Sequence, residues 1–271
     1  MLYDVNGNVI ITNGDSGVIS TKQRPLHTIS HRGYNATAPE NTIPAYVLAK
    51  KMGYEYAECD VAYTSDGVAI LLHDSTIDRT SNGSGAISSM TYEEALQYDF
   101  GSWKSAEYAG TKIPTFEEFI RVCKELRLHP YIEIKNDTEY TQEQIKNIID
   151  IVKAAGMQGN VTYLSFSVPY LSHVHAIDPQ ARLGLCSNDI TASIVSSIVG
   201  LRTEHNEVFI SARYSNVTND KITLCMNANL PLTVWTLNNA SQIETMNPYI
   251  TGVVSDSLIA EKVLYAKYIT E

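Results

Sequence analysis

Short apolar runs alternate with amphipathic segments along most of the chain, from Pro25 onward. Each apolar run has the length of a buried strand, and most are separated by segments whose apolar residues recur at helical spacing. Alternating strands and helices predict βα units and a parallel sheet. The predicted strands are 26–29, 54–61, 68–72, 131–135, 161–166, 182–186, 208–211, 232–236 and 252–255.

Helix start signals support this reading. Thr115 with Glu118, and Thr141 with Gln144, have the spacing of a capping box, in which each side chain bonds the other residue's backbone N–H. Further helix signals follow the other predicted strands. The predicted helices are 43–52, 116–126, 142–155, 169–177, 190–199, 218–229 and 258–268, with a short one after Thr91.

Eight or nine strands with intervening helices, in roughly 245 residues, fit a (β/α)8 TIM barrel occupying residues 25–271. A doubly wound open sheet is the alternative, but no Gly-x-Gly-x-x-Gly turn follows the first strand. Residues 73–114, after the third strand, are rich in Ser, Gly and Tyr. Loops of such length inside a compact domain are usually functional, so we predict a small insertion over the barrel mouth.

Residues 1–24 stand apart from this pattern. Two apolar stretches, 2–5 and 9–12, flank Asn6-Gly7, a dipeptide that favours a tight hairpin turn. We therefore expect an N-terminal β-hairpin extension, which either covers part of the barrel or attaches the chain to another module.

Composition narrows the classes of partner. The chain has 271 residues and a formal net charge of −10, which argues against nucleic acid or an anionic membrane. No run approaches the roughly 18 apolar residues of a membrane helix. The first residues lack the basic and apolar regions of a signal peptide, so we expect a cytoplasmic location, with an extracellular or virion-associated one left open. The four well-separated cysteines are expected to be buried free thiols.

Acidic residues recur on two predicted strands. Glu58 and Asp60 are two residues apart, so their side chains point to the same side of a strand. Glu133 lies on another predicted strand, 131–135, with Lys135 on the same side. Each acid alone is equally compatible with a structural ion pair. Together they form an oxygen ligand set that suits one Mg²⁺ or Ca²⁺ and not zinc.

Two histidines directly follow predicted strands, at the rim where barrel enzymes place catalytic groups: His31, with Arg32 beside it, and His73. Because histidine titrates near neutrality, two of them can divide proton removal and proton donation. A hydrogen-bonded strand-end histidine is the structural alternative. We favour that alternative for His27, His129, His173, His175 and His205.

These segments, in their order, resemble the glycerophosphodiester phosphodiesterase family. The resemblance covers about residues 26–256 and leaves residues 1–24 out. Ile134 stands where the family often has Leu, and 35–38 is a variable loop. The matching motifs are His31-Arg32-Gly33, Pro39-Glu40-Asn41-Thr42, Glu58-Cys59-Asp60, His73-Asp74, Glu133-Ile134-Lys135 and Trp235-Thr236-Leu237-Asn238.

The resemblance implies metal-dependent hydrolysis of glycerophosphodiesters to sn-glycerol 3-phosphate and an alcohol. Attack would come from water or from the glycerol 2-hydroxyl, the latter through a cyclic phosphate. The metal ligands would be Glu58, Asp60 and Glu133. We assign His31 as general base and His73 as general acid, an assignment that sequence leaves open.

The remaining motif residues receive supporting roles. Arg32, by a two-pronged contact, and Lys135 would neutralise the phosphate. By resemblance, the indole of Trp235 lines the substrate pocket. Glu40 and Asn41 are expected to orient His31 and its loop. The closing segment, 252–256, is interpreted as scaffold.

Three alternatives stay open for function. The family default is a small diester such as glycerophosphocholine, and the second enzyme reading is a glycerol-phosphate polymer such as a teichoic acid. Sphingomyelinase D-like chemistry shares the barrel but is disfavoured by the Pro39–Thr42 motif and the long insertion. A non-catalytic binding module would be expected to have lost His31, His73 or a metal carboxylate, and all are present.

Overall fold

Parallel strands form a closed ring at the centre of the protein. The computed structural model describes residues 2–3, 9–10, 26–135 and 139–257. Eight strands pair in parallel, each with the next, and the last pairs with the first, which is a TIM barrel. In ring order they are β3 (His27–Ser30), β4 (Tyr56–Tyr63), β6 (His129–Ile134), β7 (Thr162–Ser165), β8 (Arg182–Ser187), β9 (Val208–Arg213), β10 (Leu232–Trp235) and β11 (Ile250–Ser255).

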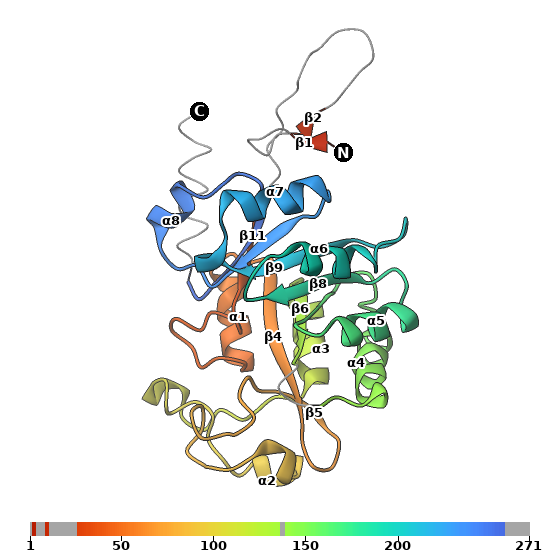
Figure 1. Ribbon diagram of the computed structural model, residues 1–271. Helices are drawn as coiled ribbons and strands as arrows, with labels where there is room; N and C mark the ends of the chain where they lie inside the picture. Colours follow the sequence, from red (N-terminus) through yellow and green to blue (C-terminus); the bar gives the residue numbers. More distant parts are fainter. Residues whose placement is uncertain (1, 4–8, 11–25, 136–138, 258–271) are drawn as a thin grey trace.

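Helices follow the strands and, apart from α2, pack against the outside of the ring (Figure 1). The predicted capping boxes at Thr115 and Thr141 are present, and the short helix after Thr91 begins with a third one. The short helix α8 was not predicted. The helices are α1 (Ile43–Lys51), α2 (Tyr92–Ala95), α3 (Phe116–Leu126), α4 (Gln142–Ala154), α5 (Val168–Ile177), α6 (Ala192–Val199), α7 (Asn219–Asn227) and α8 (Ala240–Glu244).

Alternate residues of each strand fill the inside of the ring, because strand side chains point to opposite faces in turn. Gly184 on β8 leaves room for this packing, since a Cβ there would lie 2.4 Å from the ring of Phe209. The interior is thus a packed core on which the open end of the barrel rests. Its buried members are Ile29, Tyr131, Leu164, Cys186, Phe209 and Val254.

The predicted third strand, 68–72, is not part of the ring. Its counterpart β5 (Ala69–Leu71) pairs only with β4, and antiparallel to it. The chain reverses at a turn in which Thr64 Oγ1 donates to Asp66 Oδ1 and Gly67 takes a φ of 82°. A connection this short allows only a hairpin, because a parallel crossover needs a dozen or more residues.

The segment after β5 has a small core of its own and includes α2, η1 (Ile87–Ser89) and η2 (Ala106–Tyr108). Figure 1 shows α2 and the neighbouring loops beyond the end of the long strand β4, beside β5. The segment corresponds to the predicted insertion, although the predicted domain boundaries at 24, 73 and 114 stay predictions. The buried apolar side chains of this core are Ile70, Leu72, Ile77, Ile87, Ala95, Phe100 and Ile113.

At the N-terminus, β1 (Leu2–Tyr3) pairs antiparallel with β2 (Val9–Ile10), as the predicted hairpin requires. The predicted helix 258–268 lies outside the described residues. No helix in the described ranges is both long and apolar enough to cross a bilayer. The expectation for the cysteines is confirmed: Cys59, Cys123, Cys186 and Cys225 are all buried free thiols.

Candidate active site

A cavity of about 340 Å³ opens at the carboxyl ends of the barrel strands. Residues that continue the inward-facing positions of the strands line it, so the period of two along each strand brings them together. Most of the predicted site residues are among them. The lining comprises His31, Arg32, Glu58, His73, Glu133, Lys135, Leu164, Phe166, Cys186, Asn188, Ser211, Arg213, Trp235, Thr236 and Val254.

A larger hollow, of about 680 Å³, lies against α3 and α4 on the outside of the barrel. Its lining includes Arg121 and Asp150 but none of the predicted site residues. We therefore take the smaller cavity as the candidate site, because the titratable residues converge there.

Three carboxylates gather at one side of the cavity. Glu58, Asp60 and Glu133 each offer an oxygen atom, and these atoms lie within 4.8 Å of one another. The Oδ1 atom of Asp60 is buried and accepts no hydrogen bond, although Lys135 Nζ lies 3.6 Å away. A buried carboxylate oxygen without a hydrogen-bond donor, between two further carboxylates, fits a hard divalent cation.

The titration behaviour of the cluster points the same way. Burial, followed by the charges of Asp60 and Glu133, raises the pKa of Glu58 well above its ordinary value. Burial and the charge of Asp60 also raise the pKa of Glu133. Burial opposes ionisation of Asp60 too, but the positive charges of Arg32 and Lys135 outweigh it and lower its pKa. Three negative charges at this site therefore require more positive charge than the two cations supply.

Arg32 is held by all three of its neighbouring acids. Its backbone N–H donates to Glu58 Oε2 at 3.0 Å, Nη1 donates to Glu40 Oε1 at 2.7 Å, and Nε forms an ion pair with Asp60 Oδ2 at 3.0 Å. Two of the three guanidinium nitrogens thus face carboxylates. The two-pronged phosphate contact stays a prediction, because Nη1 and Nη2 each carry two N–H groups and Glu40 takes only one of the four.

The predicted supporting residues, Glu40 and Asn41, contact the loop after His31 and also reach beyond it. Glu40 bridges Arg32 and Arg79, accepting bonds of 2.7 Å and 2.8 Å from the Arg79 guanidinium. Asn41 donates to Asp60 Oδ2 at 2.9 Å. Both therefore hold the loop that follows His31, since Glu40 binds the Arg32 side chain and the Asn41 N–H donates to the carbonyl oxygen of Arg32. An effect of either residue on His31 itself stays a prediction.

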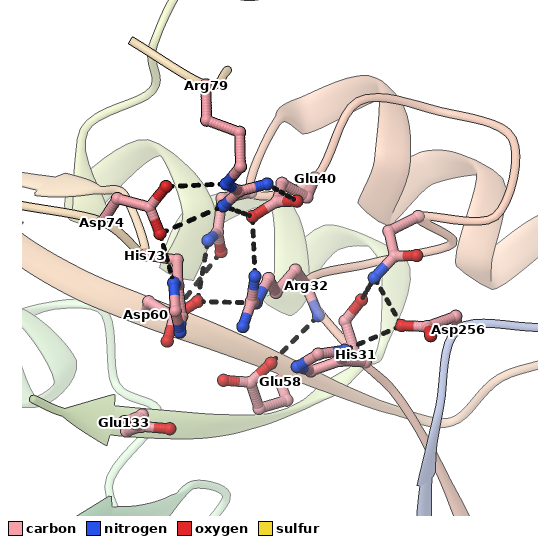
Figure 2. A network of polar contacts seen from close by, with 12 residues as sticks. His31, Arg32, Glu40, Glu58, Asp60, His73, Asp74, Arg79, Glu133 and Asp256 are labelled. Carbon is pink, nitrogen blue, oxygen red and sulfur yellow. Dashed lines mark hydrogen bonds and ion pairs between the residues drawn. The ribbon is translucent and has the colours of Figure 1, made fainter. Parts of the chain in front are cut away.

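Each rim histidine is instead paired with an aspartate. His31 Nδ1 lies 2.7 Å from Asp256 Oδ1, and His73 Nδ1 lies 2.6 Å from Asp74 Oδ1. Figure 2 shows Arg32 and Glu58 between the two histidines. With Nδ1 engaged, the opposite ring nitrogen Nε2 is the atom that can exchange a proton with a ligand.

The surroundings of both aspartates lower the pKa of each carboxyl group, so both stay ionised. Hydrogen bonds from Arg79 and His73 lower the pKa of Asp74 to about 2 against a smaller effect of burial. Burial raises the pKa of Asp256, but hydrogen bonds from His31 and two asparagines outweigh it, so the pKa falls to about 2. An ionised partner at Nδ1 favours a ring that carries its proton there.

The sequence interpretation missed the roles of Asp256, Asp74 and Arg79. Asp256 had been assigned to the scaffold, yet it follows Ser255, which pairs with Ser30 directly before His31. Ring closure between β11 and β3 therefore places Asp256 beside His31. The available signal was an acid directly after the last strand of a barrel.

Trp235 lies where the resemblance put it, on the cavity wall. Its indole N–H donates to the carbonyl oxygen of Ser211 at 3.0 Å, and its ring meets Phe166 edge to face at 5.8 Å. The two rings give this part of the cavity wall an apolar surface.

Comparisons with known proteins agree with this geometry. The model of the Glycerophosphoryl diester phosphodiesterase family matches residues 31–260. A glycerophosphodiester phosphodiesterase of Caldanaerobacter subterraneus subsp. tengcongensis is 28% identical over 229 residues, which is 84% of this chain and 93% of that protein. A glycerophosphodiester phosphodiesterase of Bacillus subtilis is 28% identical over 247 residues, or 84% and 83% of the two chains.

Solved structures show the same fold. A phosphodiesterase of Oleispira antarctica, in complex with the product sn-glycerol-3-phosphate, has a TM-score of 0.81 at 25% identity, covering 89% of this chain and 97% of that chain. A glycerophosphodiester phosphodiesterase of Agrobacterium tumefaciens has a TM-score of 0.71 at 25% identity, covering 88% and 99%.

Proposed function

Because the chain belongs to the glycerophosphoryl diester phosphodiesterase family, and is an enzyme that hydrolyses glycerophosphodiesters, we propose that it works with one divalent cation and two histidines. The products are sn-glycerol 3-phosphate and an alcohol. One observation carries the proposal: two histidines, each held by an aspartate, line the same cavity as a buried cluster of three carboxylates. The product bound to the Oleispira antarctica phosphodiesterase supports it.

Glu58, Asp60 and Glu133 would hold the cation. When bound, it supplies positive charge that polarises the phosphoryl group and offsets the three carboxylates. Mg²⁺ and Ca²⁺ both take oxygen ligands, so the ligand set is compatible with either.

Two positively charged side chains, Lys135 and Arg32, bind the phosphate from the side on which the carboxylates lie. Lys135 Nζ lies 3.5 Å from Glu133 and 3.6 Å from Asp60, at the edge of the carboxylate cluster. It can therefore contact a phosphate oxygen while remaining paired. Arg32 contributes the predicted two-pronged contact through the remaining N–H groups of Nη1 and Nη2, while Glu40 and Asp60 keep its guanidinium in place.

The two histidines divide the proton transfers. His31, neutral and held by Asp256, accepts at Nε2 the proton of the attacking oxygen, whether of water or of the glycerol 2-hydroxyl. His73, protonated and held by Asp74, donates its Nε2 proton to the leaving alcohol oxygen. After attack by water, proton exchange with solvent restores both rings. After attack by the 2-hydroxyl, water opens the cyclic phosphate: His73 accepts the proton of that water and His31 returns its proton to the glycerol 2-oxygen, which restores both rings. The indole of Trp235 and the ring of Phe166 pack against the carbon skeleton of the substrate.

Release of glycerol 3-phosphate from a small diester tests the proposal. With glycerophosphocholine, we expect release that EDTA abolishes and that Mg²⁺ or Ca²⁺ restores, because the carboxylate cluster needs a divalent cation. The ion that restores release identifies the working metal. Release that persists unchanged after complete metal removal, verified by elemental analysis, would contradict the metal-dependent scheme.

A further inference from the structure

Arg213 stands at the carboxyl end of β9, across the barrel mouth from the carboxylates of β4. In the ring, β6, β7 and β8 separate these two strands on one side, and β3, β11 and β10 separate them on the other. The two strands are therefore diametrically opposed. A ligand whose phosphate lies at Glu58 and Asp60 extends across the cavity toward Arg213.

The period of two along β9 directs Arg213 inward. Phe209 fills the barrel interior and Ser211 lines the cavity, so Arg213 continues the same face one step higher. It lines the cavity of about 340 Å³ while remaining exposed to solvent. Its position is thus at the entrance to the site, on the far side from the catalytic histidine His73.

The guanidinium of Arg213 is held in place without a negative partner. Its Nε donates to Asn188 Oδ1 at 3.1 Å, and its Cζ lies 5.1 Å from the centre of the Trp235 ring. Within the described ranges no carboxylate forms an ion pair with it, whereas Arg32, Arg79 and Arg182 each have one. Both Nη groups therefore remain available to a ligand.

An arginine fixed by stacking, with a free fork of N–H donors, suits the two-pronged recognition of a carboxylate or phosphate. We propose that Arg213 binds an anionic group on the alcohol half of the substrate. The inference rests on the proposed function, because the phosphodiester must lie at the carboxylate cluster for the alcohol to reach β9. Preferred substrates then carry a second negative charge beyond the scissile phosphate.

The same contact selects against cationic alcohols. A quaternary ammonium group at this position would meet the positive charge of Arg213, which also covers one face of Trp235. Glycerophosphocholine carries such a group, so it is then a poorer substrate than an anionic diester.

Four diesters of glycerol 3-phosphate test the inference. Their alcohols are 1,3-propanediol, 3-hydroxypropionate, glycerol monophosphate and choline, so neutral, carboxylate, phosphate and cationic ends are compared. The ratio of kcat/KM for each anionic diester over the neutral one should fall by about tenfold in Arg213→Gln, the weight of one charge-assisted contact. The larger of the two ratios in the wild-type protein distinguishes carboxylate from phosphate.

Arg121→Gln is the matched control, since it removes the same charge from an exposed position in the hollow at α3 and should keep the wild-type ratios. An equal loss on all four diesters in Arg213→Gln would mean that Arg213 only supports Trp235, and would overturn the inference. Unchanged ratios would overturn it as well.

Calorimetric binding separates this inference from the proposed function. If the wild-type protein turned over none of the diesters, the proposed function would fail. Binding would still decide the role of Arg213: weaker binding of the anionic diesters alone in Arg213→Gln supports the inference, and equal binding in both proteins contradicts it.

Discussion

Each of the two rim histidines has one ring nitrogen bonded to an aspartate and the other available to the cavity. Asn35 also donates to Asp256 at 2.7 Å, and Arg79 Nε donates to Asp74 at 2.6 Å, so each aspartate is itself fixed. The residues of the proposed proton transfers are therefore oriented before a substrate binds, which limits the reorganisation that catalysis requires.

Replacing either histidine should remove one proton-transfer step. His31→Ala and His73→Ala are each expected to lower kcat by about 10²–10⁴-fold, the usual contribution of one general acid or base. Steady-state release of glycerol 3-phosphate measures this. His205→Ala, at an exposed histidine outside the cavity, is the control and should keep the wild-type rate. Wild-type kcat in both cavity variants, with unchanged metal content, would rule out the two-histidine scheme.

Asp256 acts through His31, which makes it a positioning residue. Asp256→Asn should lower kcat by about tenfold or more, because the amide does not hold the Nδ1 proton as a carboxylate does. The informative measurement is the double variant with His31→Ala, which should lose no more than His31→Ala alone. Fully additive losses would show that Asp256 contributes to stability or folding independently of His31.

The roles and partners of the site residues could be predicted from the sequence to different degrees. Strand periodicity puts Glu58 and Asp60 on one face, the family resemblance adds Glu133, and the structure brings the three together. The partners of Arg32 could not be predicted, because its φ of 55° turns the backbone in a way that no residue pattern displays. Consequently the contacts of Glu40 with Arg79 and of Asn41 with Asp60 were not foreseen.

At the scale of elements, the hairpin of β4 and β5 explains how His73 reaches the site. β4 extends past the ring, and β5 returns along it until Leu72 N–H donates to the carbonyl oxygen of Asp60 at 3.1 Å. His73 then lies level with the carboxylates.

The element pattern itself was predicted well, except for this direction. Helix α3 begins and ends as predicted, since Thr115 and Glu118 cap it and its apolar face is regular. The antiparallel course of β5 was readable from the short connection at Asp66-Gly67, which favours a hairpin. The apolar run 68–72 indicates a strand, but only the short connection before it indicates the direction of that strand.

At the scale of the whole molecule, a second cluster of polar side chains lies at the amino ends of the barrel strands. His129 donates to or accepts from Thr162 Oγ1 through Nε2 at 2.9 Å, and Arg182 lies over the rings of Tyr131 and Phe209. Burial, followed by the charges of Arg182 and His27, lowers the pKa of His129 to about 4. Folding therefore favours its neutral form.

This pKa predicts how stability depends on pH. The lowered folded-state pKa means that the stabilisation is fully present above the unfolded value near 6.5 and is lost as pH falls toward 4. Between pH 7 and pH 5, the free energy of unfolding of the wild-type protein should fall by about 1–2 kcal/mol more than that of His129→Gln. Urea denaturation at both pH values measures the difference, with His205→Gln as control. If the free energy of unfolding fell equally in wild type and His129→Gln between pH 7 and pH 5, the lowered pKa of His129 would be contradicted.

The sequence by itself determined the alternation of strands and helices, the inward residues of each strand and the acidic ligand set, because all three depend on periods of a few residues. Only the tertiary structure decided that Asp256 holds His31, 225 residues away, and that Arg213 faces the carboxylates of β4. The physical reason is ring closure: it makes neighbours of β3 and β11 and opposites of β4 and β9, relations that no local pattern contains.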